Sequence, residues 1–162
     1  MTEGYRIRRA GSEDCDLIVR FNRAMARETE GRDLEEATIV AGVEALLADP
    51  SKGRYFLAER RAEPAAKSGG HAEVAGQLMV TPEWSDWRNG HVWWIQSVYV
   101  APAHRRRGVY RMLHEHVRET GRAEGVVGLR LYVDRGNLTA QDTYGVLGMN
   151  ESRYIMYEEV WA

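Results

Sequence analysis

Apolar residues recur every three to four positions in four segments of the chain, which is the spacing of a helix with one buried face. The first segment follows Ser12, which can cap a helix. The second has the spacing of a capping box at Asp33 and Glu36 and stops at Asp49-Pro50. The apolar positions of the four predicted helices are Leu17, Ile18, Phe21 and Met25; Ile39, Val43, Leu46 and Leu47; Val109, Met112, Leu113 and Val117; and Ala140, Tyr144 and Leu147.

Shorter apolar segments between these helices predict strands. Residues 91–100 are apolar on both faces, as expected of a central strand, and Asn89-Gly90 before them predicts a hairpin turn. The predicted strands are 5–9, 54–60, 74–81, 91–100, 126–133 and 153–161, and residues 61–73 read as a polar loop. The order β-α-α-β-β-β-α-β-α-β predicts an α/β sandwich with one core, and therefore a single domain over residues 1–162.

Composition narrows the class of protein. The 162 residues are 44% hydrophobic and 28% charged, as in an ordinary soluble globular protein. The net charge of -2 disfavours a protein that binds the phosphate backbone of nucleic acid, because such proteins are normally basic. No apolar run approaches the roughly 20 residues of a membrane span, and the first residues lack the apolar core of a secretory signal. The single cysteine, Cys15, excludes an intramolecular disulfide and a cysteine-rich zinc site, so we expect a cytoplasmic protein.

Three consecutive arginines, Arg105, Arg106 and Arg107, stand directly before Gly108, where the third helix is predicted to begin. The first turn of a helix has unpaired N–H groups and attracts anions. A glycine lets a phosphate approach the backbone, and arginines add charge-assisted hydrogen bonds. Three arginines alone would more often form a solvated cluster. The strand, turn, glycine and helix around them favour a phosphate site instead.

Two motifs together carry a family resemblance. Residues 98–113, VYVAPAHRRRGVYRML, and residues 137–149, NLTAQDTYGVLGM, resemble the cofactor motif and the later strand–helix motif of the GNAT superfamily of acetyl-CoA-dependent N-acetyltransferases. The resemblance extends over nearly the whole chain. It implies a mixed, mostly antiparallel central sheet flanked by helices, acetyl-CoA as co-substrate and no metal. At Tyr110 the chain departs from the Gly or Ala that is usual in the family.

The resemblance also implies roles for individual residues. The backbone of Val98 and Val100 would pair with the pantetheine arm and polarise the thioester carbonyl. Asn137 would contact the pantetheine region or cap the helix, and Tyr144 would lie near the sulfur. Amides and side chains of one segment would hold the pyrophosphate: Arg105, Arg106, Arg107, Gly108, Val109, Tyr110 and Arg111.

Acetylation of an amine needs a deprotonated amine, a stabilised oxyanion and a protonated leaving thiol. The phenol of Tyr144 is the candidate acid, although the same ring could be a core aromatic. Glu83 is the first candidate for the base, because the end of its strand should lie near the acceptor. A water chain could also take the proton, and the other candidate bases are Glu28, Glu30, Asp86 and His91.

Four of the five tryptophans lie between residues 84 and 94. They could form cross-strand pairs in a hairpin, or offer aromatic faces to an amine. Glu28, Trp84 and Trp94 are therefore candidates for binding a small-molecule or peptide amine. His114 and His116 are two positions apart and diverge on their helix, so we expect them not to share a metal ion.

Two other functions remain open. The chain could be a non-catalytic acyl-CoA-binding or sensing module with the same fold. Residues 104–122, which hold six arginines and two glutamates, could bind nucleic acid, but the overall charge argues against it. We expect no nucleic-acid or membrane partner, while exposed strand edges and the tryptophans would allow a homodimer.

Overall fold

The computed structural model describes residues 4–61 and 72–161, so most of the predicted loop 61–73 lies outside the described residues. The chain divides into two compact units, Met1–Leu131 and Tyr132–Ala162, and each is described by itself. The assignment of one domain to residues 1–162 stays a prediction.

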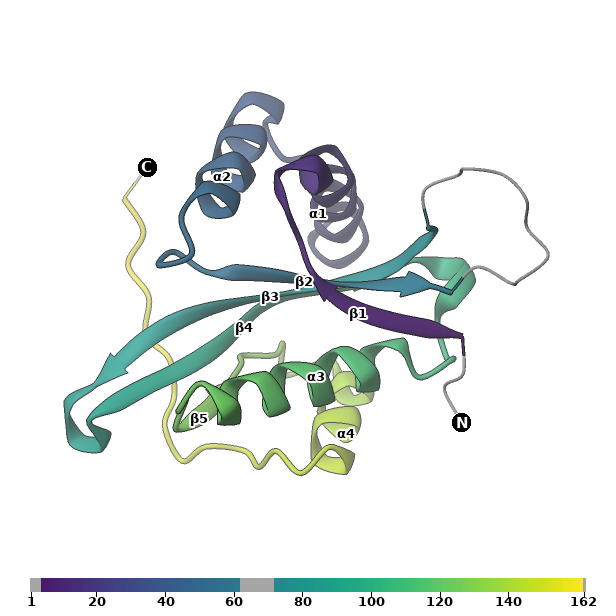
Figure 1. Ribbon diagram of the computed structural model, residues 1–162. Helices are drawn as coiled ribbons and strands as arrows, with labels where there is room; N and C mark the ends of the chain where they lie inside the picture. The colour runs from purple at the N-terminus through teal and green to yellow at the C-terminus, as the bar shows by residue number, and fades with distance from the viewer. Residues whose placement is uncertain (1–3, 62–71, 162) are drawn as a thin grey trace. The chain divides into compact units, whose positions relative to one another are not determined.

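The first unit contains a five-stranded sheet with the strand order β1-β2-β3-β4-β5 (Figure 1). Neighbouring strands are antiparallel except for β4 and β5, which are parallel. This confirms the predicted mixed, mostly antiparallel sheet. The elements of this unit are β1 (Tyr5–Arg9), α1 (Cys15–Glu30), α2 (Glu36–Ala48), β2 (Arg54–Arg60), β3 (Val74–Ser85), β4 (Gly90–Val100), α3 (Val109–Ala123) and β5 (Gly128–Arg130).

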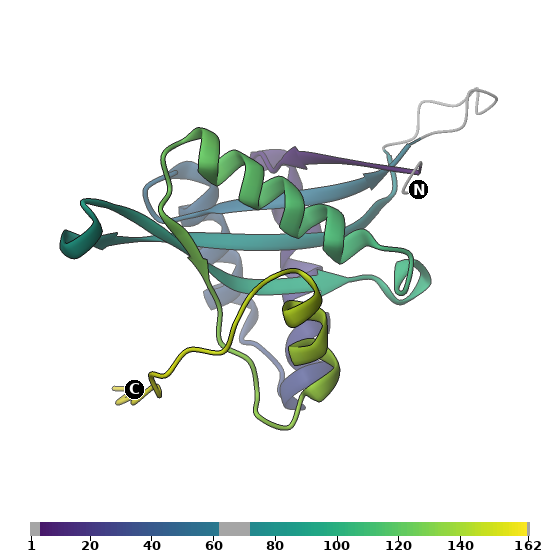
Figure 2. The same cartoon turned by 90° about the horizontal axis from the view of Figure 1, so that it is seen from below.

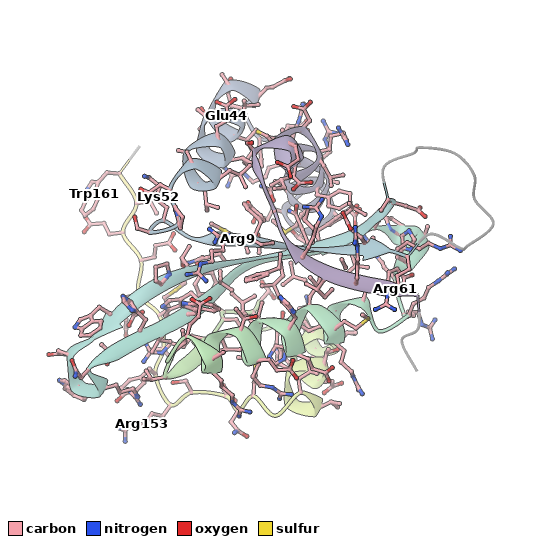
Figure 3. The ribbon with its side chains drawn as sticks, viewed as in Figure 1. Arg9, Glu44, Lys52, Arg61, Arg153 and Trp161 are labelled. Carbon is pink, nitrogen blue, oxygen red and sulfur yellow. The ribbon has the colours of Figure 1, made fainter. Side chains whose placement is uncertain are left out.

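Helices cover both faces of the sheet. Helices α1 and α2 lie on one face and α3 lies on the other (Figures 1 and 2). Leu78 and Leu113 belong to the core on the α3 side, and Ile18 and Leu57 belong to the core on the α1–α2 side. The polar side of α2 points away from the sheet, as Glu44 shows in Figure 3. The apolar stripes of the sequence therefore mark the buried faces of these helices.

Two predicted helix starts are wrong in detail. A 3-10 turn occupies Ser12–Asp14, so Ser12 does not cap α1. Asp14 precedes α1 instead, and its carboxylate accepts hydrogen bonds from the Gly11 amide and from Arg8. At α2 the cap is Glu35, whose carboxylate accepts from the amides of residues 37 and 38, whereas Asp33 pairs with Arg27. At α1 the 3-10 turn and the Arg8–Asp14 ion pair replace the predicted cap. At α2 the carboxylate of Glu35 lies closer to the free amides than Asp33 does.

The second unit holds the last helix, α4 (Leu138–Val146). Gly148 follows it with a φ of 85°, which confirms the predicted glycine at its end. The strand predicted over 153–161 is wrong, because these residues have no regular secondary structure. The strand predicted over 126–133 is reduced to β5. Strand-forming residues make a strand only where a partner takes up their backbone hydrogen bonds, and a pattern of side chains does not supply the partner.

Candidate cofactor and acceptor site

The central strand β4 has two different ends. β5 pairs with β4 only from Val92 to Trp94, which we call the paired end. Residues Ile95–Val100 continue the strand with β3 on one side, and we call them the open end. On the other side, no strand of the described residues 4–61 and 72–161 pairs with the open end. A bulge at Gln96, between Ile95 and Ser97 in the register with β3, separates the two ends. A bulge bends its strand, which accounts for the divergence of β4 from β5.

The open end turns the backbone groups of Val98 and Val100 away from β3. The carbonyl oxygen of Tyr99 lies 2.7 Å from the place of a Cβ on Gly76 of β3, so this carbonyl faces β3. Adjacent residues of a strand direct their N–H and C=O groups to opposite edges. Val98 and Val100 therefore present theirs at the free edge, which is the edge that the sequence motif assigned to the pantetheine arm.

The arginine turn, Arg105–Gly108, follows the open end of β4. Pro102–His104 form a short 3-10 turn, and α3 begins directly after the arginine turn. Arg106 and Gly108 have φ values of 61° and 78°, which is the left-handed conformation. Left-handed residues among successive N–H groups produce concave backbone that binds anions, and the start of α3 adds its unpaired amides. The predicted helix start at Gly108 is confirmed.

Arg105 joins the turn to β4 and to the end of α1. Its Nε donates to the carbonyl oxygen of Val100 at 2.9 Å, and its Nη2 donates to Glu28 at 2.5 Å. Its guanidinium also lies 5.6 Å from the ring centre of Tyr99, whose hydroxyl donates to Glu28 at 2.9 Å. Hydrogen bonds from Arg105 and Tyr99 lower the pKa of Glu28. Glu28 is thus held next to the proposed cofactor turn.

The sequence analysis missed Tyr99 as a member of this cluster. Burial and the neighbouring Glu28 raise the pKa of its phenol, so the hydroxyl stays protonated and donates. In the sequence this residue is one apolar position of a continuous apolar strand. Only the packing of α1 on the sheet, where the ring of Phe21 lies 5.1 Å from that of Tyr99, brings it to Glu28.

Glu83 lies at the paired end of β4 and binds two partners there. One carboxylate oxygen accepts from Nη1 of Arg130 on β5 at 2.8 Å, and the other accepts from the indole N–H of Trp94 on β4. The guanidinium of Arg130 lies 5.6 Å from the ring centre of Trp94. The cluster connects β3, β4 and β5, and the two hydrogen bonds stabilise the ionised form of Glu83 and so make it a weaker proton acceptor.

The candidate acceptor residues do not all meet in one place. Trp94 contacts Glu83, and Trp84 on the hairpin is 56% exposed and stands edge-on to His91. Glu28 instead contacts the open end through Tyr99. Five residues of strand separate Trp94 from Tyr99, which is roughly 16 Å. The structure therefore places the carboxylates Glu28 and Glu83 at opposite ends of β4.

Other predicted site residues lie on the helices. Arg106, Arg107 and Arg111 are exposed at the start of α3. Val109 is buried in the core beneath α3, so only its backbone could serve a ligand. The ring of Tyr110 packs beside His114 one turn further along α3, with ring centres 6.0 Å apart.

Two predicted site residues belong to the second unit. The side-chain oxygen of Asn137 accepts from the amide of Ala140 at 3.1 Å, so Asn137 caps α4, one of the two roles left open by the sequence. Tyr144 is half-buried on α4, and burial raises the pKa of its phenol. The cofactor contact of Asn137 and the acid role of Tyr144 stay predictions.

Comparison with known families gives the identity of this fold. Residues 18–149 match the family model of the acetyltransferase (GNAT) family. The chain belongs to the GNAT family. The mixed sheet with its flanking helices agrees with that membership and with the resemblance seen in the two sequence motifs.

Solved structures of GNAT-like proteins are similar to this chain. A possible acetyltransferase from Clostridium difficile 630 is 40% identical, with 99% of each chain covered and a TM-score of 0.86. AAC(6')-Iy, solved in complex with the bisubstrate analog CoA-S-monomethyl-acetylneamine, is 18% identical over 97% of this chain and 99% of its own, with a TM-score of 0.73. A ribosomal-protein-alanine N-acetyltransferase from Brucella melitensis biovar Abortus 2308 is 13% identical, with the same coverage and a TM-score of 0.71. The similarity of the last two to this chain shows a common fold and nothing more. No curated protein matches the chain.

None of the helices that the structure describes is long and apolar enough to cross a membrane. Within the same residues, no three His, Cys, Asp or Glu side chains gather in a way that could hold a metal ion.

Proposed function

We propose that this GNAT protein is an acetyl-CoA-dependent N-acetyltransferase that moves the acetyl group to an amine by direct attack, without a covalent enzyme intermediate. The observation that carries the proposal is the open end of β4 running directly into the arginine turn. Backbone groups at a free strand edge suit the amides of an extended arm. A left-handed turn at the start of a helix suits phosphates. The two features follow each other along the chain in the order that a pantetheine arm and a pyrophosphate require.

The residues present fit this cofactor, which would supply the acetyl group as a thioester. Val98 would pair with the arm through its backbone groups, and Val100 would pair through its amide, because its carbonyl oxygen already accepts from Arg105. The amides of Arg105–Gly108 and of the first turn of α3 would bind the phosphates. Arg105 has five N–H donors and uses one for Val100 and one for Glu28, so further donors are left to add to the phosphate contacts.

The amine nitrogen forms a bond to the acetyl carbon, and the carbon–sulfur bond breaks. A backbone N–H of the open end stabilises the oxyanion, because a fixed donor needs no rearrangement when the charge develops. Tyr144 gives its phenolic proton to the leaving thiolate, and a base takes the proton that the amine loses.

The assignment of the base to Glu83 remains a sequence-based proposal. Its competitors are Glu28, Glu30, Asp86, His91 and water, and each oxygen of Glu83 already accepts one hydrogen bond, from Arg130 or from Trp94. The acceptor is proposed to be a small-molecule or peptide amine that uses Glu28, Trp84 and Trp94. Among the proteins of similar fold, one was solved with the bisubstrate analog CoA-S-monomethyl-acetylneamine and another is named a ribosomal-protein-alanine N-acetyltransferase.

Release of free thiol from acetyl-CoA in the presence of a panel of amines tests the proposal. The panel should include polyamines, aminoglycosides, amino acids and peptides with free N-termini. We expect release that depends on the amine and equals the amount of N-acetylated product detected by mass spectrometry. CoA binding by calorimetry without turnover on any amine would favour the acyl-CoA-binding module. Absence of CoA binding would contradict both functions.

A further inference from the structure

A buried histidine lies immediately before the arginine turn. His104 is 3% exposed and is the one buried residue of the segment 101–108, all of which the structure describes. Both ring nitrogens have a partner. Nδ1 lies 2.9 Å from the hydroxyl oxygen of Tyr5, and Nε2 lies 3.0 Å from a carboxylate oxygen of Glu73. The ring also stands edge-on to that of Tyr5, with centres 5.8 Å apart.

The two partners of His104 are themselves fixed to the sheet. Tyr5 is buried and opens β1. Glu73 directly precedes β3, and its backbone carbonyl accepts from the amide of Arg60 at the end of β2 at 2.7 Å. The residue before the turn is tied in as well, because the amide of Ala101 donates to Ala75 on β3 at 2.9 Å. One imidazole thus connects the turn to three neighbouring strands.

We propose that His104 is a positioning residue for the cofactor: it fixes the arginine turn to the sheet through Tyr5 and Glu73 and so sets the affinity for the cofactor's phosphates. This inference rests on the proposed function. Its physical basis is preorganisation. A turn that contains left-handed residues such as Arg106 must be ordered before its amides can converge on an anion. A site that is ordered in advance binds more tightly than one that becomes ordered on binding.

The anchor works in either protonation state of His104, as the hydrogen-bond network indicates. In the neutral ring, Nε2–H donates to Glu73 and Nδ1 accepts from the hydroxyl of Tyr5. In the imidazolium, both nitrogens donate and the Tyr5 oxygen accepts. Glu73 is also 3.6 Å from the guanidinium of Arg60. His104 therefore keeps both of its hydrogen-bond partners in each protonation state.

The test measures both the ligand-free turn and CoA binding. His104→Phe keeps a ring but removes both hydrogen bonds. We expect the amides of residues 105–109 to exchange with solvent about tenfold faster in the ligand-free variant. We expect the dissociation constant of CoA to rise about tenfold, equivalent to about 1.4 kcal/mol. The kcat at saturating acetyl-CoA should stay within about threefold, since no reacting atom contacts His104.

Matched variants separate this effect from a general loss of stability. His116→Phe changes a histidine of α3 that packs edge-on against Phe56. It should leave both the amide exchange of residues 105–109 and the affinity for CoA unchanged. His104→Gln keeps a donor for Glu73 and should recover part of the affinity. Tyr5→Phe removes one hydrogen bond and should change the amide exchange rates and the dissociation constant of CoA by about threefold. This variant tests the inference if His104→Phe fails to fold. Unchanged amide exchange in the folded variant would overturn the inference even if the protein binds no CoA. Absence of CoA binding by the unmodified protein would contradict the proposed function alone.

Discussion

The paired and open ends of β4 belong to one strand, yet they differ in their neighbouring strands and in the polar side chains around them. At the paired end, Val92–Trp94 have a strand on each side, and the Glu83–Arg130 ion pair connects the three strands. At the open end, the backbone groups of Val98 and Val100 face a free edge. Polar side chains from distant segments gather there, among them Glu28, Arg105 and His104.

The difference teaches that the proposed site depends on a missing neighbouring strand more than on special side chains. The bulge at Gln96 ends the pairing with β5, and the backbone itself becomes available to a ligand. The side chains around the open end then act mainly by fixing the turn that follows it. The predictions below test this division, beginning with the largest expected effect.

Tyr144→Phe tests the chemistry for which the open end is proposed. The variant removes the phenolic hydroxyl and keeps the ring, so folding and CoA binding should persist. Loss of a general acid should lower kcat by roughly 10²–10⁴-fold, or about 3–5 kcal/mol of barrier, with little change in the KM for acetyl-CoA. Steady-state kinetics measure this, and Tyr154→Phe, at a tyrosine that is 71% exposed, is the control. A variant with near-normal kcat would show that the thiolate leaves without help from Tyr144.

Gly108→Val tests whether the arginine turn holds the phosphates. We expect the dissociation constant of CoA to rise by about 100-fold or more, because a branched side chain is added where the backbone should meet a phosphate. The left-handed φ of 78° also makes any side chain there costly, by about 1–2 kcal/mol. Calorimetric titration with CoA measures the affinity, and thermal unfolding measures the strain.

Gly125→Val is the matched control for this strain. Gly125 has a φ of 77° and open space around the place of a Cβ. The Gly125→Val variant should therefore lower the free energy of unfolding by about as much as Gly108→Val does, and it should leave CoA binding unchanged. Equal CoA affinity in the two variants would contradict the phosphate site at the arginine turn.

Arg105→Ala tests the link between the turn and Glu28. CoA binding should weaken several-fold, since the backbone amides of the turn remain. The pKa of Glu28 should rise toward its ordinary value, because Arg105 is the main cause of its lowering. A lowered pKa stabilises the folded protein at pH above the ordinary carboxyl pKa, and this contribution is lost as the pH falls through the lowered value. The Arg105→Ala variant should therefore lose this small contribution of Glu28 to the pH dependence of stability. An NMR titration of the Glu28 carboxyl group in both proteins measures the pKa, and an unchanged pKa would contradict the ion pair.

The sequence predicted the sheet, the helices and the start of α3, because buried faces and a glycine at a helix start leave local patterns. It could not predict which edge of β4 is open, since alternation of side chains reports the two faces of a strand and not its two edges. It also missed Tyr99 and His104, because local patterns do not report partners that are 71 and 99 residues away in the sequence. It also predicted a strand over 153–161, where residues such as Ile155 and Val160 favour extended backbone but the described structure offers no partner strand.

Glu83→Gln is expected to have the smallest effect, and it decides what the paired end contributes. If Glu83 takes the amine's proton, turnover should fall chiefly at lower pH, where more of the amine is protonated and help is most needed. Because Arg130 and Trp94 occupy both oxygens, we expect this fall to be no more than several-fold. The ion pair is partly exposed, so its loss should cost at most about 1 kcal/mol of stability. Glu44→Gln, at an exposed carboxylate of α2 that is not a candidate base, is the control for charge alone. An unchanged pH–rate profile together with a lower unfolding temperature would limit Glu83 to joining β3, β4 and β5. The proton would then go to Glu28, His91 or water, and of these only His91 lies at the paired end of β4.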